Sequence, residues 1–470
     1  MSRETVVVGA GVAGLNAAAA LAQAGVNVTV LERRAYVGGR AYSYLHPALD
    51  EVVDSQHVLL GCCTNLLEFC AEAGVAEKIS WYDEQTFLTP DGSASVIARS
   101  RLPVPFEYAG SFLRAPMLGA GDKVAVARGL MGLMRGTRES DDESVAQWYR
   151  RTGQTERAVR HLWEPIVLAT LNDNAENCSM GYAGKVFYEI FLKNAEGGRL
   201  GIPTVPLSEF YAAGSALVEA RGGCVQLRAG VEALIRRDDG RWELRTNDAA
   251  YVADDVVLAL PFEQTERLVS GMAVRGAEAA AMQADLIEGM GRFVHSPFIS
   301  ILLWFDREIT DLDHAWLLDT TIQWFFHKSR IRRYAPERGS YVELVIAGSR
   351  TELPKSRAEI LEPALQELQR FFPDVAKAKL LKSGVLKEAR ATFSVTPGLE
   401  RGRPAQATGI PGLYLAGDWT RTDWPSTMEG AARSGRLAAG AVMGDPLKFL
   451  VPELPAEGVM SWLANSRKRN

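Results

Sequence analysis

The feature that most constrains this chain is a glycine motif directly after a short β-branched run near the amino terminus. Residues 6–8 are three valines and predict a buried strand, and Gly9, Gly11 and Gly14 follow with the spacing G-x-G-x-x-G. The first glycine permits a tight turn, the second lets the backbone approach a pyrophosphate, and the third lets the next helix pack against the strand. The motif therefore predicts an α/β fold of the Rossmann type that binds a dinucleotide at a helix N-terminus.

Glu32 extends this pattern. It stands at the end of a second predicted strand, residues 26–31, where a carboxylate can accept hydrogen bonds from a ribose diol. A glycine-rich helix start in an unrelated α/β fold is the alternative interpretation. The run from Thr5 to Leu31 contains no charged residue and has the length of a membrane span. Its glycines predict a strand, a turn and a helix instead.

A second glycine pair bears on which dinucleotide is bound. Gly38 and Gly39 precede Arg40, shortly after Glu32. NAD does not need this pair, whereas a longer cofactor lying across the domain would use Arg40 to neutralise phosphate charge. We therefore expect FAD, held at this end of the chain by Gly9, Ala10, Gly11, Val12, Ala13, Gly14, Glu32, Arg33, Gly38, Gly39 and Arg40. The chain contains one G-x-G-x-x-G and so predicts no separate nicotinamide domain, and we expect an external electron donor, NADPH or a reductase.

The carboxyl-terminal part predicts a second contribution to the same site. Residues 413–416 predict a strand that ends at Gly417-Asp418, and a helix of small residues begins at Met428. Asp418 would bind a ribityl hydroxyl, and the amides of Met428 and Glu429 would stabilise negative charge on the reduced flavin. A plain strand-turn-helix is the alternative. Both ends of the chain would thus form one domain, with a second domain inserted between them.

The E-x(5)-G-G-R motif from Glu32 to Arg40 resembles that of the flavin-dependent amine oxidase and carotenoid desaturase superfamily. The resemblance implies a Rossmann-like FAD-binding domain with an inserted α+β substrate domain. It also implies a backbone contact from Val231 to the adenine, for which a generic β-meander is the alternative. The implied FAD-binding domain comprises residues 1–61, 205–268 and 383–446, the substrate domain residues 62–204 and 269–382, and a tail residues 447–470.

Local patterns predict further elements. An Asp-Asp-Gly turn at residues 238–240 predicts a hairpin. The spacing of apolar residues predicts helices over 122–135, 144–153, 154–172 and 355–372, and strands over 298–305, 322–326 and 341–346.

Longer strings narrow the resemblance. Residues 53–65 (VDSQHVLLGCCTN), 163–172 (WEPIVLATLN) and 417–430 (GDWTRTDWPSTMEG) are similar to the squalene-associated flavoenzymes of hopanoid biosynthesis, the hydroxysqualene dehydroxylases. The resemblance runs from residue 5 to about 445, and the stretch between Asp54 and Gln56 is about one residue shorter than in that family. It implies that an allylic hydroxyl on an apolar C30 isoprenoid is replaced by hydrogen, which gives squalene.

This reaction requires a proton for the leaving hydroxyl and a dry channel for the isoprenoid. His57 is the candidate proton donor, because histidine exchanges protons near neutral pH; a structural histidine bonded to backbone is the alternative. Other residues of the matching strings are candidate substrate contacts, with plain core packing as their alternative. These candidates are Gln56, Trp163, Trp304, Trp324, Phe325 and Thr427.

Two other classes of function remain open. One is FAD-dependent desaturation of a carotenoid or isoprenoid, or amine oxidation, in which the flavin accepts electrons. Against amine oxidation, Thr427 stands where amine oxidases usually carry an aromatic cage residue, and residues 291–297 lack the lysine that they often place facing the flavin. The other is a non-catalytic flavin-binding partner in a lipid-enzyme complex.

Composition excludes further partners. The 470 residues carry a net charge of −5, which does not favour nucleic acid as a partner. Five cysteines without a C-x-x-C pair predict no metal site and a reducing, cytoplasmic location. The last cysteine, Cys224, lies far from Gly417, so we expect the FAD to be non-covalent.

An apolar substrate dissolves in the bilayer, so we expect the enzyme to act peripherally at the inner face of the cell membrane. The segment from Leu102 to Met134 combines apolar side chains with Arg101, Arg114 and Lys123, a composition that suits an anionic lipid surface. The alternative is that this segment only covers the substrate domain.

Overall fold

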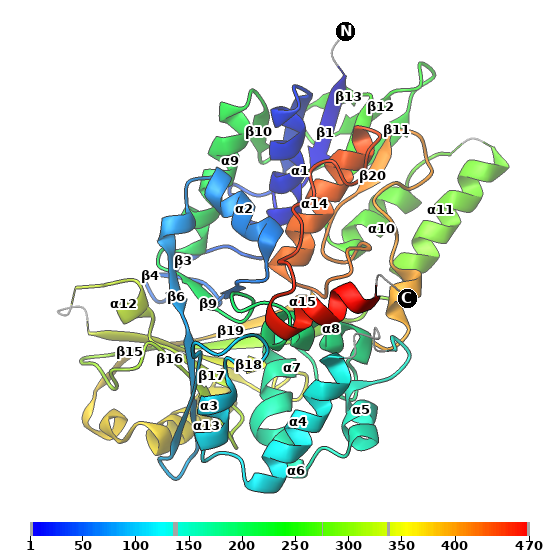
Figure 1. Cartoon of the computed structure of the whole chain (residues 1–470). Coiled ribbons are helices and arrows are strands. Elements are labelled where there is room, and N and C mark those ends of the chain that lie inside the picture. Colours follow the sequence, from blue (N-terminus) through cyan, green and yellow to red (C-terminus); the bar gives the residue numbers. More distant parts are fainter. Residues whose placement is uncertain (1–2, 135–139, 275, 336–338, 468–470) are drawn as a thin grey trace.

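The computed structural model describes residues 3–134, 140–274, 276–335 and 339–467. Figure 1 shows that the amino-terminal segment, in blue, and the helix α14 (Met428–Val442), in orange-red, meet in one domain, while the middle of the chain builds most of a second domain. We call them the parallel-sheet domain and the substrate domain. The predicted α/β fold, with one domain inserted into another, is confirmed.

The parallel-sheet domain is built on a sheet whose strand order is β10-β2-β1-β14-β20. All neighbouring pairs are parallel, and most residues of the central strands are buried because helices cover both faces. The strands are β1 (Glu4–Val8), β2 (Asn27–Glu32), β10 (Cys224–Leu227), β14 (Asp255–Leu258) and β20 (Leu413–Leu415). The helices of this domain include α1 (Val12–Gln23), α9 (Leu207–Ala220) and α14 (Met428–Val442).

Small residues bring the two ends of the chain together. A Cβ atom at Gly435 in α14 would lie 2.1 Å from the carbonyl oxygen of Ala13 in α1. A larger residue would separate these helices, so the alanine and glycine content of both allows their close crossing. This contact explains why segments more than 400 residues apart form one core.

The predicted hairpin at residues 238–240 is present. It joins β11 (Ala233–Arg236) to β12 (Trp242–Arg245), and β13 (Ala250–Ala253) completes this antiparallel sheet. Gly240 has a φ of +83°, which a turn of this kind requires.

The substrate domain contains a large mixed sheet with the strand order β19-β15-β18-β17-β16-β7-β8. Its strands are β7 (Glu84–Leu88), β8 (Ala94–Ala98), β15 (His295–Phe305), β16 (His314–Leu317), β17 (Trp324–Phe326), β18 (Ser340–Ala347) and β19 (Leu380–Phe393). One face packs on α13 (Arg357–Phe371) through a core that includes Ile301, Leu344 and Leu368. We call this the outer face of the sheet and the opposite one the inner face.

A helical part covers the rest of the substrate domain. It contains α3 (Ala109–Arg114), α4 (Ala120–Met134), α5 (Val145–Thr152), α6 (Glu156–Ala158), α7 (Glu164–Leu171) and α8 (Met180–Phe191). The helix predicted over 144–153 is α5, with Ser144 and Gln147 forming its capping box and Gly153 in the left-handed conformation at its end. The helix predicted over 122–135 is α4, and Arg135 lies outside the described residues.

The helix predicted over 154–172 is present over most of its length, with an irregular turn inside it. The structure has α6, a π-helical turn at Val159–Trp163 and α7. Pro165, the second residue of α7, has no amide hydrogen to donate to the preceding turn, so the regular hydrogen-bond pattern is interrupted there.

Two predicted domain boundaries also need correction. The boundary at residue 62 is misplaced because α2 (Thr64–Glu72) packs in the core of the parallel-sheet domain, where Phe69 lies against Gly214 of α9. The boundary at residue 383 falls inside β19, which pairs with β15 along nearly its whole length. The docking of α2 and the length of β19 thus set these domain boundaries, and local composition does not show either.

The remaining described elements link these parts. They are β3 (Tyr44–His46), β4 (Glu51–Val53), β5 (Leu59–Leu60), β6 (Ile79–Tyr82), β9 (Leu200–Pro203), α10 (Phe262–Ser270), α11 (Ala277–Met290), α12 (Lys328–Ile331) and α15 (Gly458–Arg467), with short 3-10 turns at Ala76–Lys78, Pro373–Lys377 and Leu399–Gly402. Within the described ranges, no helix is both long enough and apolar enough to cross a membrane.

Candidate active site

The first glycine motif forms a tight turn between β1 and α1. Gly9 has a φ of +104°, and a Cβ atom there would lie 2.6 Å from the carbonyl oxygen of Ala259. A Cβ atom at Gly14 would lie 1.9 Å from the Gly9 carbonyl oxygen. Gly11 precedes α1, and no side chain caps this helix, so the amides of Val12 and Ala13 stand at an open helix N-terminus.

The second glycine motif packs directly against the first. The Gly38 amide donates to the Ala10 carbonyl over 2.8 Å, and a Cβ atom at Gly39 would lie 3.0 Å from the Cα atom of Gly11. Two glycine loops therefore run side by side without side chains between them. This arrangement fits a pyrophosphate, whose oxygens need backbone amides at close range.

Glu32 lies beneath the glycine turn. Its carboxylate accepts hydrogen bonds from the amides of Ala10 and Arg34, each over 2.8 Å, and the residue is 7% exposed. The amide of Ala229 donates to the Glu32 carbonyl, which brings the segment containing Val231 beside the end of β2. The side chain of Arg33 is exposed next to this segment. The residues predicted to hold the adenosine half thus lie together, and their contacts with FAD stay predictions.

Arg40 and Asp418 join the two ends of the chain. They form an ion pair, Ser426 also donates to the Asp418 carboxylate, and Gly417 has a φ of +148°. A Cβ atom at Gly417 would lie 2.5 Å from the indole nitrogen of Trp419, so glycine is required there. Arg40 and Asp418 were expected to bind phosphate and ribityl groups, and their proximity is consistent with one shared site.

The start of α14 differs in detail from the prediction. The Thr427 hydroxyl accepts a hydrogen bond from the Gly430 amide and caps the helix, which engages the side chain proposed to contact substrate. The Met428 sulfur accepts a hydrogen bond from the Tyr211 hydroxyl over 2.9 Å. The Thr427 side chain therefore caps the helix start, and its contact with substrate stays a prediction.

The side chain of Glu429 has a structural role that the sequence did not predict. Its buried carboxylate accepts hydrogen bonds from the amides of Asn65 and Leu66, so it caps α2 and its side chain is not directed at a cofactor. Burial raises the pKa of Glu429. Only the backbone amide of Glu429 stays a candidate for the flavin site.

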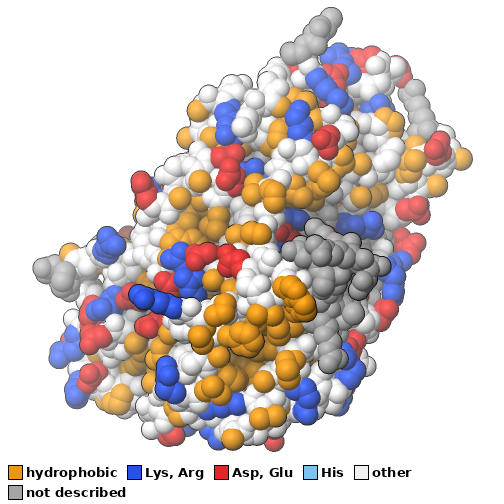
Figure 2. All heavy atoms as spheres, in the orientation of Figure 1, with side chains coloured by type: hydrophobic (Ala, Val, Ile, Leu, Met, Phe, Trp, Pro, Cys, Tyr) orange, Lys and Arg blue, Asp and Glu red, His pale blue; other side chains and the backbone are white. Residues whose placement is uncertain are grey.

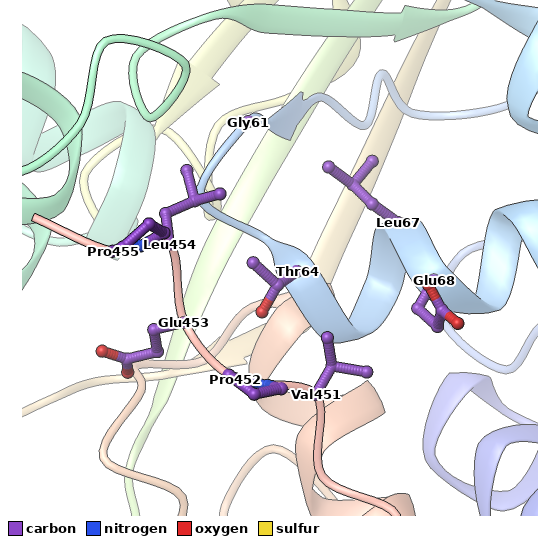
Figure 3. Close-up of a pocket in the computed structure, with 9 residues that line it drawn as sticks. All are labelled: Gly61, Thr64, Leu67, Glu68, Val451, Pro452, Glu453, Leu454 and Pro455. Carbon is purple, nitrogen blue, oxygen red and sulfur yellow. The ribbon is translucent and has the colours of Figure 1, made fainter. Parts of the chain in front are cut away.

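A pocket of about 490 Å³ lies between α2 and the carboxyl-terminal tail. Figure 3 shows Thr64 and Leu67 of α2 together with Val451 and Leu454 of the tail around it. None of the predicted site residues lines this pocket. It therefore lies apart from the candidate active site.

The inner face of the mixed sheet carries two of the predicted substrate residues. Trp304 stacks on Tyr341 with ring centroids 4.3 Å apart, and Trp324 lies 4.0 Å from Trp316. The indole nitrogen of Trp324 is buried and has no hydrogen-bond partner among the described residues. Both pairs lie on the side of the sheet away from α13, and we call the two pairs together the aromatic wall.

Two other predicted substrate residues are core residues. Phe325 follows Trp324 in the same strand, so it points to the outer face and packs against Phe372. Trp163 is fully buried in the helical part, where its indole nitrogen donates to Gln154 and its ring packs on Trp148. The prediction that Phe325 and Trp163 line the substrate site is therefore wrong.

Gln56 and His57 lie next to the inner face. The Gln56 amide donates to the Glu343 carboxylate over 2.8 Å, and the Gln56 side chain donates to the His57 carbonyl. Glu343 shares the inner face of β18 with Tyr341 and Val345, which lie two residues before and after it. Val53 packs with Trp304 and Tyr341 in one small core. The segment carrying His57 is thereby held against the aromatic wall.

The ring of His57 has one occupied and one open nitrogen. Nδ1 lies 2.8 Å from the Ser55 carbonyl, so Nδ1 carries the hydrogen. Nε2 then has a lone pair and makes no hydrogen bond to any described residue. Burial lowers the pKa of His57 below its ordinary 6.5, while the charges of Asp54 and Glu343 act in the opposite direction. The resting ring is neutral. A proton taken up on Nε2 would be stabilised by those two carboxylates and opposed by the charge of Lys328.

A buried cluster of charges beside His57 was not predicted from the sequence. Lys328 lies between the carboxylates of Asp54 and Glu343, and Arg332 binds Asp54 over 2.7 Å. The side chains of the four residues are at most 4% exposed. Burial opposes the ionisation of Asp54, but the charges of Lys328 and Arg332 outweigh it and hold the pKa of Asp54 well below its usual range.

This charge cluster connects the two domains. Asp54 also accepts hydrogen bonds from the Ser43 hydroxyl and the Leu207 amide, which belong to the parallel-sheet domain, whereas Glu343 belongs to the mixed sheet. The sequence offered one signal: Glu343 is the lone acid in an apolar strand. Its partners come from segments far away in the chain, so their pairing was not visible.

Comparison with known proteins shows which family this chain resembles. The family model of flavin containing amine oxidoreductases matches residues 12–443. The chain is 26% identical over 469 residues to 15-cis-phytoene desaturase of Solanum lycopersicum, covering 94% of this chain and 78% of that protein. It is 25% identical to zeta-carotene desaturase of Synechocystis, covering 96% and 99%.

Solved structures share the fold. An oxidoreductase from Methanosarcina mazei superposes with a TM-score of 0.72 at 19% identity, covering 94% of this chain and all of that one. Cyclohexylamine oxidase from Brevibacterium oxydans superposes with a TM-score of 0.67 at 16% identity, covering 94% and 99%. The glycine cradle and the family match together identify the cofactor as FAD. The chain belongs to the flavin containing amine oxidoreductase family and is an FAD-dependent oxidoreductase.

Proposed function

We propose that this oxidoreductase removes the allylic hydroxyl of hydroxysqualene reductively and forms squalene. The observation that carries the proposal is the open Nε2 atom of His57. Its neighbour Gln56 is bound by Glu343, on the same sheet face that carries the aromatic wall of Trp304 and Trp324. A long hydrocarbon with one hydroxyl matches such a wall. The strings at residues 53–65 and 417–430, which resemble hydroxysqualene dehydroxylases, support the same substrate.

The residues of the chain have distinct tasks in this reaction. The glycine loops, Glu32, Arg40 and Asp418 would hold FAD, which when reduced supplies a hydride. Nε2 of His57 orients the substrate hydroxyl and, once protonated, gives its proton to that hydroxyl, which leaves as water. Asp54 and Glu343 stabilise the charged ring during this transfer. The aromatic wall excludes water from the allylic cation that remains.

The test uses the purified enzyme, photoreduced without oxygen and mixed with hydroxysqualene. We expect squalene to form in step with reoxidation of the flavin, without an added donor in a single turnover. For multiple turnovers we propose an external donor, NADPH or a reductase. Reoxidation without squalene, or no reoxidation at all, would refute the dehydroxylation.

Desaturation of a carotene-type hydrocarbon is the second candidate function. It is favoured by the similarity to the phytoene and zeta-carotene desaturases, which extends over 94% and 96% of the chain. In that direction the neutral Nε2 of His57 would act as a base that takes a proton from the substrate. Oxidised enzyme mixed with phytoene would then bleach its flavin and extend the conjugated system, and putrescine serves as the control for amine oxidation.

A further inference from the structure

An exposed apolar surface joins the carboxyl-terminal helix to the segment before α3. Figure 2 shows hydrophobic side chains gathered over α3, α4 and the region next to α15. Large apolar side chains that are about half exposed or more on these elements are Leu102, Phe106, Leu113, Val124, Met131 and Trp462. We call these six residues the apolar surface. Such concentrations on a protein surface mark interaction sites.

Backbone contacts hold the parts of this surface together. The Val459 amide donates to the Val104 carbonyl, and a Cβ atom at Gly458 would lie 2.4 Å from the same oxygen, so α15 begins directly against the segment of Leu102 and Phe106. Lys123 donates to the Leu113 carbonyl over 2.7 Å and ties the start of α4 to the end of α3. The apolar surface is therefore one assembled feature of the fold.

The tail that leads to α15 is itself fixed. Glu453 forms ion pairs with Lys185 and Lys193, and the Asn194 side chain donates to the Pro455 carbonyl. These contacts connect the tail to α8 and the residues after it. Trp462 is 69% exposed although the helix that carries it is anchored in this way. The Trp462 side chain is therefore exposed while its helix is packed in place, and not because the tail is loose.

Cations surround the apolar surface. Arg101 and Arg114 form no ion pair with any other described residue. Lys123 and Arg128 donate to backbone carbonyls, which leaves their charges without a counter-ion. Glu107 in the same segment is buried and lacks a hydrogen-bond partner among the described residues, and burial raises the pKa of its carboxyl. The surface is thus apolar and positively charged at the same time.

We propose that the apolar surface, completed by Trp462 of α15, docks this protein on an anionic lipid membrane. Apolar side chains ringed by cations match a bilayer with acidic headgroups. A second copy of the chain fits less well, because a two-fold contact would bring two copies of the same positively charged surface together. The proposal does not depend on which isoprenoid the enzyme converts.

Flotation of the FAD-loaded enzyme with phosphatidylcholine vesicles, with and without phosphatidylglycerol, tests the proposal. We expect the wild type to float with the phosphatidylglycerol vesicles. The double variant Leu113→Asp with Trp462→Asp should bind at least about tenfold more weakly, because each change removes an apolar side chain from the lipid. Leu45→Asp is the matched control, since Leu45 is 62% exposed in β3 and should leave flotation unchanged.

A second pair of variants tests the charge. Arg101→Gln and Arg114→Gln should each weaken binding to phosphatidylglycerol vesicles about fivefold and leave binding to neutral vesicles unchanged. Flavin absorbance and the unfolding temperature verify that each variant is folded. A wild type that fails to float at low salt, or a Leu113/Trp462 variant that floats like it, would overturn the proposal. So would a dimeric wild type whose Leu113/Trp462 variant is monomeric and still floats, because the apolar surface would then be a contact between two copies of the chain. Flotation uses no isoprenoid, so a failure to form squalene does not affect this result.

Discussion

The two faces of the mixed sheet have the same strands but different tasks. On the outer face, Ile301, Leu344 and Phe325 pack against α13 in an apolar core. On the inner face, Trp304 and Trp324 form an aromatic wall, and Glu343 belongs to a buried charge cluster. The comparison shows that the alternation of side chains places neighbouring residues of one strand in two sets, a structural one and a candidate functional one.

The comparison of the two faces also explains why buried charged groups lie on the inner face. Buried charges cost free energy unless they are paired, so a cluster beside a candidate catalytic histidine points to a positioning task. Asp54 holds the segment of His57 between two domains, and Glu343 binds the amide of Gln56. The outer face needs only tight packing. The following predictions test this division, from the largest expected effect to the smallest.

Replacement of His57 should have the largest effect on activity. His57→Gln should lower kcat/KM of dehydroxylation about 10²- to 10⁴-fold, the usual contribution of a general acid. Since the protonated ring is the active form and burial lowers the pKa of His57, wild-type activity should fall as pH rises through a value below 6.5. The variant should lack this dependence, and His46→Gln is the control. Activity that falls as pH decreases would instead indicate a base and favour desaturation.

Removal of Lys328 should strongly destabilise the fold. Lys328→Ala leaves the carboxylates of Asp54 and Glu343 buried with less compensation, and we expect a loss of about 3–5 kcal/mol in the free energy of unfolding. Lys382→Ala is the control, because Lys382 is 40% exposed and its pair with Glu51 should contribute about 1 kcal/mol or less. Denaturant titration measures both. Equal losses of unfolding free energy in the two variants would show that Lys328 does not compensate the buried carboxylates of Asp54 and Glu343.

Truncation on the outer face should affect stability without affecting the substrate. Phe325→Ala removes a fully buried ring and should cost about 3–5 kcal/mol of unfolding free energy. At a temperature where the variant is folded, its KM should equal that of the wild type. A KM increase beyond that of a second outer-face variant, Leu344→Ala, would show that Phe325 contacts substrate after all.

A mild change on the inner face should give the reverse pattern. Trp324→Phe keeps an aromatic side chain, so we expect a stability loss below about 1.5 kcal/mol. It removes the unpaired indole N–H and part of the wall, so KM should rise several-fold. Steady-state kinetics beside thermal unfolding checks both. An unchanged KM with a large stability loss would show that Trp324 is a core residue, and that the inner face does not differ from the outer face in this respect.

The sequence by itself determined the backbone features of the FAD site. Gly9, Gly14 and Gly39 stand where a Cβ atom would collide or crowd its neighbours, and their spacing between a strand and a helix is a local property. The same holds for the capped helix at residues 144–153 and the hairpin at 238–240. Such features depend on residues close in the chain, so a linear pattern predicts them.

Only the tertiary structure decided which side chains share a surface. Trp324 and Phe325 look alike as sequence, and the packing of α13 assigns them to opposite faces. Glu429 lies beside residues expected to meet the cofactor, yet its carboxylate caps a helix that begins 365 positions earlier, at Thr64. Such partners are chosen by long-range packing and by the need to pair buried charges. Neither leaves a pattern in the neighbouring residues, because the partners are neighbours only after the chain has folded.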